Sequence, residues 1–155
     1  MRQLGYMSGG SWRSLQGGSR VRYPLRRLSD IRFYCRVSDK GVIYVGERTS
    51  FNYGCVLIAH ERIEIGRGCL FGPNVHVYDF DHGMSQNGIM YRDQPTTTAP
   101  VRIGDNVWFG ANVVVLKGVT IGDNAVIAAN SVICKDVPAN TLVHTKRDLI
   151  YRALQ

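Results

Sequence analysis

The stretch from Ile103 to Val132, IGDNVWFGANVVVLKGVTIGDNAVIAANSV, contains the tetrapeptide IGDN twice, beginning at Ile103 and again at Ile121. A period of six runs through it. Large apolar residues occupy every sixth position, and a second inward series stands two places before them. The first series is Ile103, Phe109, Val115, Ile121, Ile127 and Ile133, and the second is Val101, Val107, Val113, Val119, Ala125 and Ser131. This period matches neither a helix, at 3.6 residues, nor the plain alternation of a long strand. It predicts short strands joined by tight turns.

The same spacing extends into the first half of the chain and fades near Phe33. The series there is Val45, Phe51, Leu57, Ile65, Phe71 and Val77, with Ile43, Thr49, Cys55, Ile63, Cys69 and Val75 two places earlier. One step, from Leu57 to Ile65, spans eight residues instead of six. Gly, Asp and Asn between the apolar positions tolerate the left-handed backbone of a sharp corner. Stacked units of this kind bury one continuous core, so the sequence predicts a solenoid.

Length and composition indicate a single domain without a membrane span. A chain of 155 residues is one domain's worth, and it has no apolar run of the roughly 18 residues that span a bilayer. The N-terminus lacks the continuous apolar segment of a secretory signal, so we expect a cytoplasmic protein. The cysteines have no CxxC spacing, which argues against a zinc knuckle or a redox pair. We expect all four as reduced core thiols: Cys35, Cys55, Cys69 and Cys134.

The positive charge is concentrated at one end. Residues 1–40 hold nine basic and two acidic side chains, which accounts for the whole net charge of +7. We therefore divide the chain into a basic Gly/Arg-rich arm leading into the solenoid (1–38), the solenoid itself (39–143) and a tail (144–155). The arm is expected to be solvated, with contact to an anionic membrane as the weaker alternative. Nucleic-acid binding is not expected, because no recognised module accompanies the charge.

The repeat is interrupted once. Residues 83–100, GMSQNGIMYRDQPTTTAP, have no six-residue register, yet the register resumes at Val101. The segment must therefore protrude from the solenoid as an excursion. A long irregular excursion inside a compact repeat is uncommon and usually functional. It begins directly after His82.

Three segments carry a resemblance to a known family. They are NYGCVLIAHERIEIGRGCLFGPNVHVYDFDH (Asn52 to His82), IGDNVWFGAN (Ile103 to Asn112) and GVTIGDNAVIAANSVICKDVPANTLV (Gly118 to Val143). The chain resembles the hexapeptide-repeat acyltransferases, close to the maltose, galactoside and nodulation-factor acetyltransferases and to enzymes that acetylate O-antigen or capsular sugars. This resemblance implies an all-β fold, a left-handed parallel β-helix with three hexads to a turn and one protruding loop. The hand rests on the resemblance alone, because parallel β crossovers are otherwise right-handed.

The resemblance also implies a reaction and its catalytic groups. His82 matches the family's catalytic histidine, which as a general base accepts the proton of a sugar hydroxyl while that oxygen attacks a thioester carbonyl. The backbone N–H after the W-[IF]-G turn belongs to Ala111 here, and it would stabilise the developing oxyanion. The donor is acetyl-CoA, the acceptor is a sugar or glycan precursor of polysaccharide biosynthesis, and no metal is expected.

Further residues match the family's binding positions. Asn52 stands at the acceptor-binding asparagine, and Trp108 at the aromatic beside the acyl-donor channel. Ala129 and Lys135 match positions that line the groove for the pantetheine arm and nucleotide. In the family that groove lies between neighbouring subunits, so the resemblance implies a homotrimer.

The chain departs from the family pattern in two places. After PANTLV the family continues with a GxPA segment, whereas this chain has HTKRDLIYRALQ, in which Lys146, Arg147 and Arg152 could bind phosphates. The family's N-terminal helical region is replaced by the basic arm. The carboxylate or carbonyl that orients His82 stays open, with Asp79, Asp81 and Asp93 all near it in the sequence.

Other functions remain as alternatives. One is an acetyltransferase acting on an amino sugar or an antibiotic, and another is a β-helical scaffold that has lost catalysis. A third is a zinc enzyme resembling the γ-class carbonic anhydrases, which needs three convergent histidines. His76 and His82 are six residues apart, so we expect them on successive faces of the prism, and His60 and His144 in structural roles.

Overall fold

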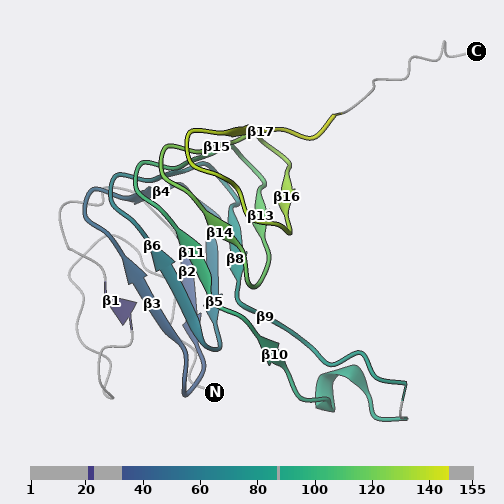
Figure 1. Cartoon of the computed structure of the whole chain (residues 1–155). Coiled ribbons are helices and arrows are strands. Elements are labelled where there is room, and N and C mark those ends of the chain that lie inside the picture. The colour runs from purple at the N-terminus through teal and green to yellow at the C-terminus, as the bar shows by residue number, and fades with distance from the viewer. Residues whose placement is uncertain (1–20, 23–32, 87, 147–155) are drawn as a thin grey trace, which may run out of the picture.

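The computed structural model describes residues 33–86 and 88–146, together with the backbone of Val21 and Arg22. Short parallel strands wind into a solenoid of stacked coils, from which one excursion protrudes (Figure 1). The predicted β-solenoid is thereby confirmed. Most of the basic arm and the end of the tail, including Arg147 and Arg152, lie outside the described residues. In the part of the chain that is described, no helix is long and apolar enough to cross a membrane.

The strands form three parallel faces, each with one strand from successive coils. Face A contains β1 (Val21–Arg22), β3 (Val42–Val45), β6 (Arg62–Ile65), β11 (Val101–Ile103) and β14 (Thr120–Ile121). Face B contains β2 (Tyr34–Val37), β5 (Val56–Ala59), β8 (His76–Tyr78), β13 (Val114–Val115) and β16 (Val132–Ile133). Face C contains β4 (Ser50–Phe51), β7 (Leu70–Phe71), β12 (Trp108–Phe109), β15 (Val126–Ile127) and β17 (Leu142–Val143). The chain visits the faces in the order B, A, C.

The strand register explains the period of six. Ile103 pairs with Ile121, a separation of 18 residues, because three hexads complete one coil. Between Ile43 and Ile63 the separation is 20, because the corner after β5 is two residues wider. This corner is the eight-residue step seen in the sequence.

The core lies inside the prism and consists of the two predicted inward series. Every member of both series is buried, including the polar residues Thr49 and Ser131. Four phenylalanine rings, Phe33, Phe51, Phe71 and Phe109, stack in one column with centroids 4.6, 4.5 and 4.5 Å apart. Burial of one such ring stabilises the fold by about 1.5–3 kcal/mol. The column of rings reaches back to Phe33, directly before β2.

The cysteine expectation is correct for three thiols and wrong for one. Cys35, Cys55 and Cys69 are buried and free, but Cys134 is exposed. It follows the inward-facing Ile133 directly, and consecutive residues of a strand point to opposite sides. Burial raises the pKa of the Cys55 thiol to about 11, and raises that of Cys35 further.

Asparagines hold the corners in the left-handed conformation. Six of them have φ between 56° and 59°: Asn74, Asn106, Asn112, Asn124, Asn130 and Asn140. Their side chains form ladders from coil to coil. The Asn112 amide accepts from Asn74 at 3.1 Å and donates to Asn130 at 3.1 Å. Asparagine therefore suits these corners for two reasons: it adopts the left-handed backbone conformation, and its side-chain amide forms the hydrogen bonds of the ladder.

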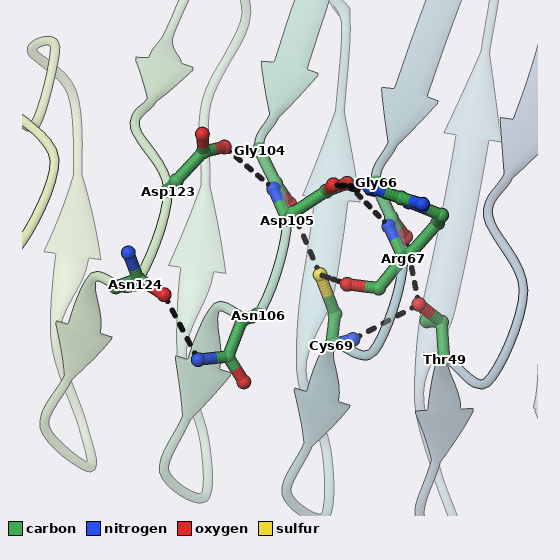
Figure 2. A network of polar contacts seen from close by, with 9 residues as sticks. All are labelled: Thr49, Gly66, Arg67, Cys69, Gly104, Asp105, Asn106, Asp123 and Asn124. Carbon is green, nitrogen blue, oxygen red and sulfur yellow. Dashed lines mark hydrogen bonds and ion pairs between the residues drawn. The ribbon is translucent and has the colours of Figure 1, made fainter.

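Side chains of one coil also satisfy the backbone of the next at the corner between faces A and C (Figure 2). The Arg67 N–H donates to Asp105 Oδ1 at 2.7 Å, and the Asp105 N–H donates to Asp123 Oδ1 at 2.7 Å. The Arg67 backbone and side-chain donors lower the pKa of the Asp105 carboxyl. Deeper in the same corner, the Cys69 thiol donates to the Gly104 carbonyl at 3.1 Å. The coils are thus joined by side chains as well as by strand pairing.

Candidate functional site

The excursion leaves the solenoid at the corner between faces B and A. Its stem is a short antiparallel pair, β9 (Phe80–Asp81) with β10 (Thr97–Thr98), and its outer part contains one 3-10 turn, η1 (Tyr91–Asp93). The stem begins before Gly83, so the chain leaves the coil earlier than the sequence predicts. It returns to the register at Val101, as expected. Figure 1 shows the excursion standing well clear of the stacked coils.

Two internal braces hold the excursion in shape. The Gln94 side chain is buried, accepts from the Ser85 N–H at 2.9 Å and donates to the carbonyls of Ser85 and Ile89 at 3.0 and 2.8 Å. A Cβ added to Gly83 would lie 2.9 Å from the Gln94 side chain, so only glycine fits directly after His82. At the stem, Lys117 from the next coil pairs with Asp81 at 3.0 Å and donates to Thr97. The segment has little regular structure but is well braced.

Asp79, the last residue before the stem, has a structural task. Its carboxylate is fully buried. Oδ1 accepts the His60 N–H at 2.7 Å, while Oδ2 accepts the N–H groups of Glu61 and Arg62 at 2.8 and 2.6 Å. These three donors form the widened corner of the preceding coil. Asp79 therefore caps that corner.

The three candidates for orienting His82 have other partners. Asp79 holds the corner amides, Asp81 pairs with Lys117, and Asp93 lies 3.8 Å from its sequence neighbour Arg92. The exposed His82 ring instead meets the Phe80 ring, with centroids 6.0 Å apart and planes at 74°. His82 thus has an aromatic neighbour.

His82 ends a row of outward-pointing rings that we call the aromatic row: His76, Tyr78, Phe80 and His82. Successive centroids lie 6.0, 6.4 and 6.0 Å apart, each pair edge to face. The Tyr78 hydroxyl lies 3.2 Å from His76 Nδ1. The row was missed in the sequence, although the alternation in HVYDFDH signals a strand that continues past β8. It also corrects the expectation that His76 and His82 lie on successive faces.

His60, expected as a structural residue, joins the aromatic row from the preceding coil. Its ring stacks on Phe80 with centroids 3.8 Å apart and planes at 5°. Desolvation by burial lowers its pKa, and the nearby Arg36 and His82 lower it further, while Asp79 acts in the opposite direction. Among the described residues, no three His, Cys, Asp or Glu side chains converge on a point that could hold a metal.

Three of the remaining predicted site residues, Asn52, Ala111 and Ala129, lie at the other edge of face B, at the corner with face C. Asn52 follows β4 and is exposed, its Oδ1 accepting the Tyr53 N–H at 2.8 Å. Ala111 and Ala129 occupy the equivalent corner of later coils, and Trp108 is 53% exposed on β12 beside them. No acceptor for the Ala111 N–H is found in the described part of the chain.

One chain thus separates its candidate residues into two groups. His82 and the exposed Lys135 belong to the edge between faces B and A. Asn52, Ala111 and Ala129 belong to the edge between faces C and B. Face B lies between the two groups, so a single copy does not bring them together.

The three faces also differ on their outer sides. On face A, Glu64 pairs with Arg62 at 2.8 Å and with Arg102 at 3.4 Å. Face C instead presents an apolar row in register, Leu70, Trp108, Val126 and Leu142, of which three are more than half exposed. Face B presents Val56, His76, Val114 and Val132 in register. In these rows faces B and C are mostly apolar, with His76 as the exception, whereas face A is charged.

Comparisons with known proteins agree with this architecture. Residues 100–135 match the family model described as bacterial transferase hexapeptide (six repeats). Nodulation protein L of Rhizobium meliloti is 41% identical over 116 residues, 72% of this chain and 58% of that protein. Galactoside O-acetyltransferase of Escherichia coli is 36% identical over 104 residues, 64% of this chain and 48% of that protein. The chain spans about half the length of the curated relatives it matches.

Solved structures are similar as well. A hexapeptide-repeat-containing acetyltransferase from Vibrio cholerae is 34% identical with a TM-score of 0.60, over 79% of this chain and 72% of that one. The same protein complexed with acetyl coenzyme A is 36% identical with a TM-score of 0.63, over 78% of this chain and 65% of that one.

Proposed function

Because the chain belongs to the hexapeptide-repeat acetyltransferases, we propose that it transfers an acetyl group from acetyl-CoA to a hydroxyl of a sugar or glycan precursor. The observation that carries the proposal is His82, an exposed imidazole at the root of a braced excursion. Relatives named for galactoside acetylation, and the acetyl-CoA complex of a similar structure, support the substrate classes.

The chemistry assigns one task to each group. Neutral His82 accepts the proton of the acceptor hydroxyl while that oxygen forms a bond to the acetyl carbonyl carbon. The Ala111 N–H donates to the negative oxygen of the tetrahedral intermediate. When the intermediate collapses, the carbon–sulfur bond breaks and the CoA thiolate takes the proton from the imidazolium. The products are the acetyl ester and free CoA, and the imidazole is neutral again.

The site forms between copies in this proposal. A cyclic trimer would place the edge carrying His82 and Lys135 of one copy against the edge carrying Asn52, Ala111 and Ala129 of the next. The apolar outer sides of faces B and C support this packing, because a closed ring buries such surfaces. Asn52 would then contact the acceptor, and Trp108, Ala129 and Lys135 the donor. The three buried free thiols favour a reducing cytoplasmic location.

The first experiment measures thiol release from acetyl-CoA across a panel of sugars and aminoglycosides, with wild type and His82→Ala. We expect release with a hydroxyl acceptor and a loss of at least about a hundredfold in the variant, the usual contribution of a general base. Unchanged release in His82→Ala would remove His82 from the mechanism. Release with amino acceptors alone would favour the N-acetylating alternative, and neither release nor acetyl-CoA binding would favour the scaffold.

The second experiment tests the shared site by mixing inactive variants. Copies carrying His82→Ala and copies carrying Asn52→Ala, unfolded and refolded together, should regain activity, because some grooves then receive both intact edges. Either variant mixed with the double variant His82→Ala, Asn52→Ala is the matched control, since no groove in it is complete. Equal activity in test and control mixtures would contradict a site built from two copies.

A further inference from the structure

His60 lies closer to the chemistry than its place in the preceding coil suggests. It begins the widened corner after β5, and its backbone is fixed from two sides. The Ser38 hydroxyl donates to the His60 carbonyl at 3.0 Å, and Asp79 accepts the His60 N–H at 2.7 Å. With its backbone held in this way, the ring lies flat on Phe80 at a centroid distance of 3.8 Å.

Phe80 links His60 to His82. One neighbour stacks on its ring, and the other meets it edge to face at 6.0 Å. The Tyr78 ring packs edge to face against Phe80 as well, at 6.4 Å. Because aromatic pairs favour stacked or edge-to-face arrangements, these contacts restrict where the His82 ring can lie. The neighbouring carboxylates have other partners, so the rings take over the positioning.

We propose that His60 is a positioning residue for His82: its ring holds His82 through Phe80, and the side chain at position 60 determines which charge lies beside the general base. This inference rests on the proposed role of His82. Nothing in the sequence comparison assigns His60 a role, and its contact with the aromatic row exists only because the corner after β5 is widened.

The charges around His60 explain why it can serve as a neutral neighbour. Arg36 on β2 and His82 at the excursion root both disfavour a proton on His60. Asp79, at the end of β8, favours one, and Glu61 follows His60 on the same corner. Burial is the largest influence, and the pKa of His60 is lower than usual. The lowered pKa favours the uncharged form of the ring, which does not repel a proton on His82.

The test is a series at position 60. His60→Phe keeps a stacking ring without charge, His60→Ala removes the ring, and His60→Arg adds a permanent cation that can still stack on Phe80. The readouts are kcat, the two KM values and the pH dependence of kcat/KM. An imidazole NMR titration of His82 gives its pKa independently of catalysis.

We expect His60→Phe to stay within about twofold of wild type, with an unchanged acidic limb. His60→Ala should lower kcat by about tenfold while the KM for acetyl-CoA stays constant, because the base loses its position. His60→Arg should move the acidic limb and the His82 titration to lower pH by about half a unit, as expected for a cation nearby at a protein surface. If His60 had only a structural role, His60→Arg would shift neither the acidic limb of kcat/KM nor the His82 titration.

Two results would overturn the inference: wild-type kcat in His60→Ala, or a His82 titration that does not move in His60→Arg. The failure of the proposed function looks different, because His82→Ala would then retain activity. Even in that case the NMR titration decides whether the charge at position 60 reaches His82.

Discussion

The substitution Asp79→Asn tests whether the buried Asp79 carboxylate stabilises the fold by capping the widened corner. The substitution preserves the shape of a buried side chain and one oxygen, which can still accept the His60 N–H. The other oxygen becomes an NH2 group that faces the N–H groups of Glu61 and Arg62, where two acceptor contacts of 2.8 and 2.6 Å existed. Donors then face donors at the widened corner.

The expected cost follows from these two contacts. Hydrogen bonds to a charged group contribute about 1.5–3 kcal/mol each, so the upper bound is about 3–6 kcal/mol. Glu61 is exposed, and water can therefore replace part of what its N–H loses. We expect the free energy of unfolding to fall by about 2–4 kcal/mol.

The measurement is urea unfolding followed by circular dichroism, with all variants at one protein concentration because subunit association contributes to stability. With a slope of about 2 kcal/mol per molar urea, the midpoint should fall by about 1–2 M. Asp136→Asn removes a carboxylate that accepts a single N–H among the described residues, that of Thr120, and should cost about 1 kcal/mol. Asp93→Asn, exposed in the excursion, should be neutral. Equal midpoints for Asp79→Asn and Asp93→Asn would refute the capping role.

Four further predictions concern the excursion and the cysteines. Gly83→Ala should lower kcat by about tenfold, since its Cβ would press on Gln94 and move His82, the proposed base; Met84→Ala, at an exposed position, is the control. Lys117→Met should loosen the stem, seen as faster hydrogen exchange in the excursion while exchange in the core is unchanged. Native protein should react with a thiol reagent only at Cys134 among the described cysteines. The unfolded Cys55 thiol ionises near pH 9 and the folded one near 11, so stability should fall as pH rises through this interval, and Cys55→Ala should fall less.

The sequence predicts the repeated part of the molecule well, because each inward position of one coil is pressed against its equivalent in the next. A period of six was therefore sufficient to identify Phe51, Phe71 and Phe109 as core residues in register. Asparagines at the corners were predictable for the same reason, since a left-handed turn restricts the residue type.

The irregular part was less predictable, because its contacts join residues that no period relates. The stacking of His60 on Phe80 depends on the two extra residues of one corner and on the capping by Asp79. In the sequence Asp79 is a candidate for orienting His82, because proximity along the chain does not reveal that its oxygens point back to the preceding coil. The contact of Lys117 with Asp81 comes from a later coil. In the six-residue pattern Lys117 occupies an ordinary corner position, so nothing in the sequence indicates this contact.

A solenoid also constrains how a catalytic site can be built. Its outward side chains lie in parallel rows, so residues from different faces of one copy diverge instead of converging. An acyl transfer needs a base, an oxyanion donor and two substrates around one carbon atom. In the proposed mechanism these groups come from two places. The excursion presents His82 as the base away from the prism, and the edge of a second copy presents the Ala111 N–H as the oxyanion donor. If the mixed variants of His82 and Asn52 regain activity, subunit packing through faces B and C is required to assemble the active site and also contributes to stability. In that case trimer dissociation should abolish activity at protein concentrations where the coils are still folded, which dilution with parallel circular dichroism would measure.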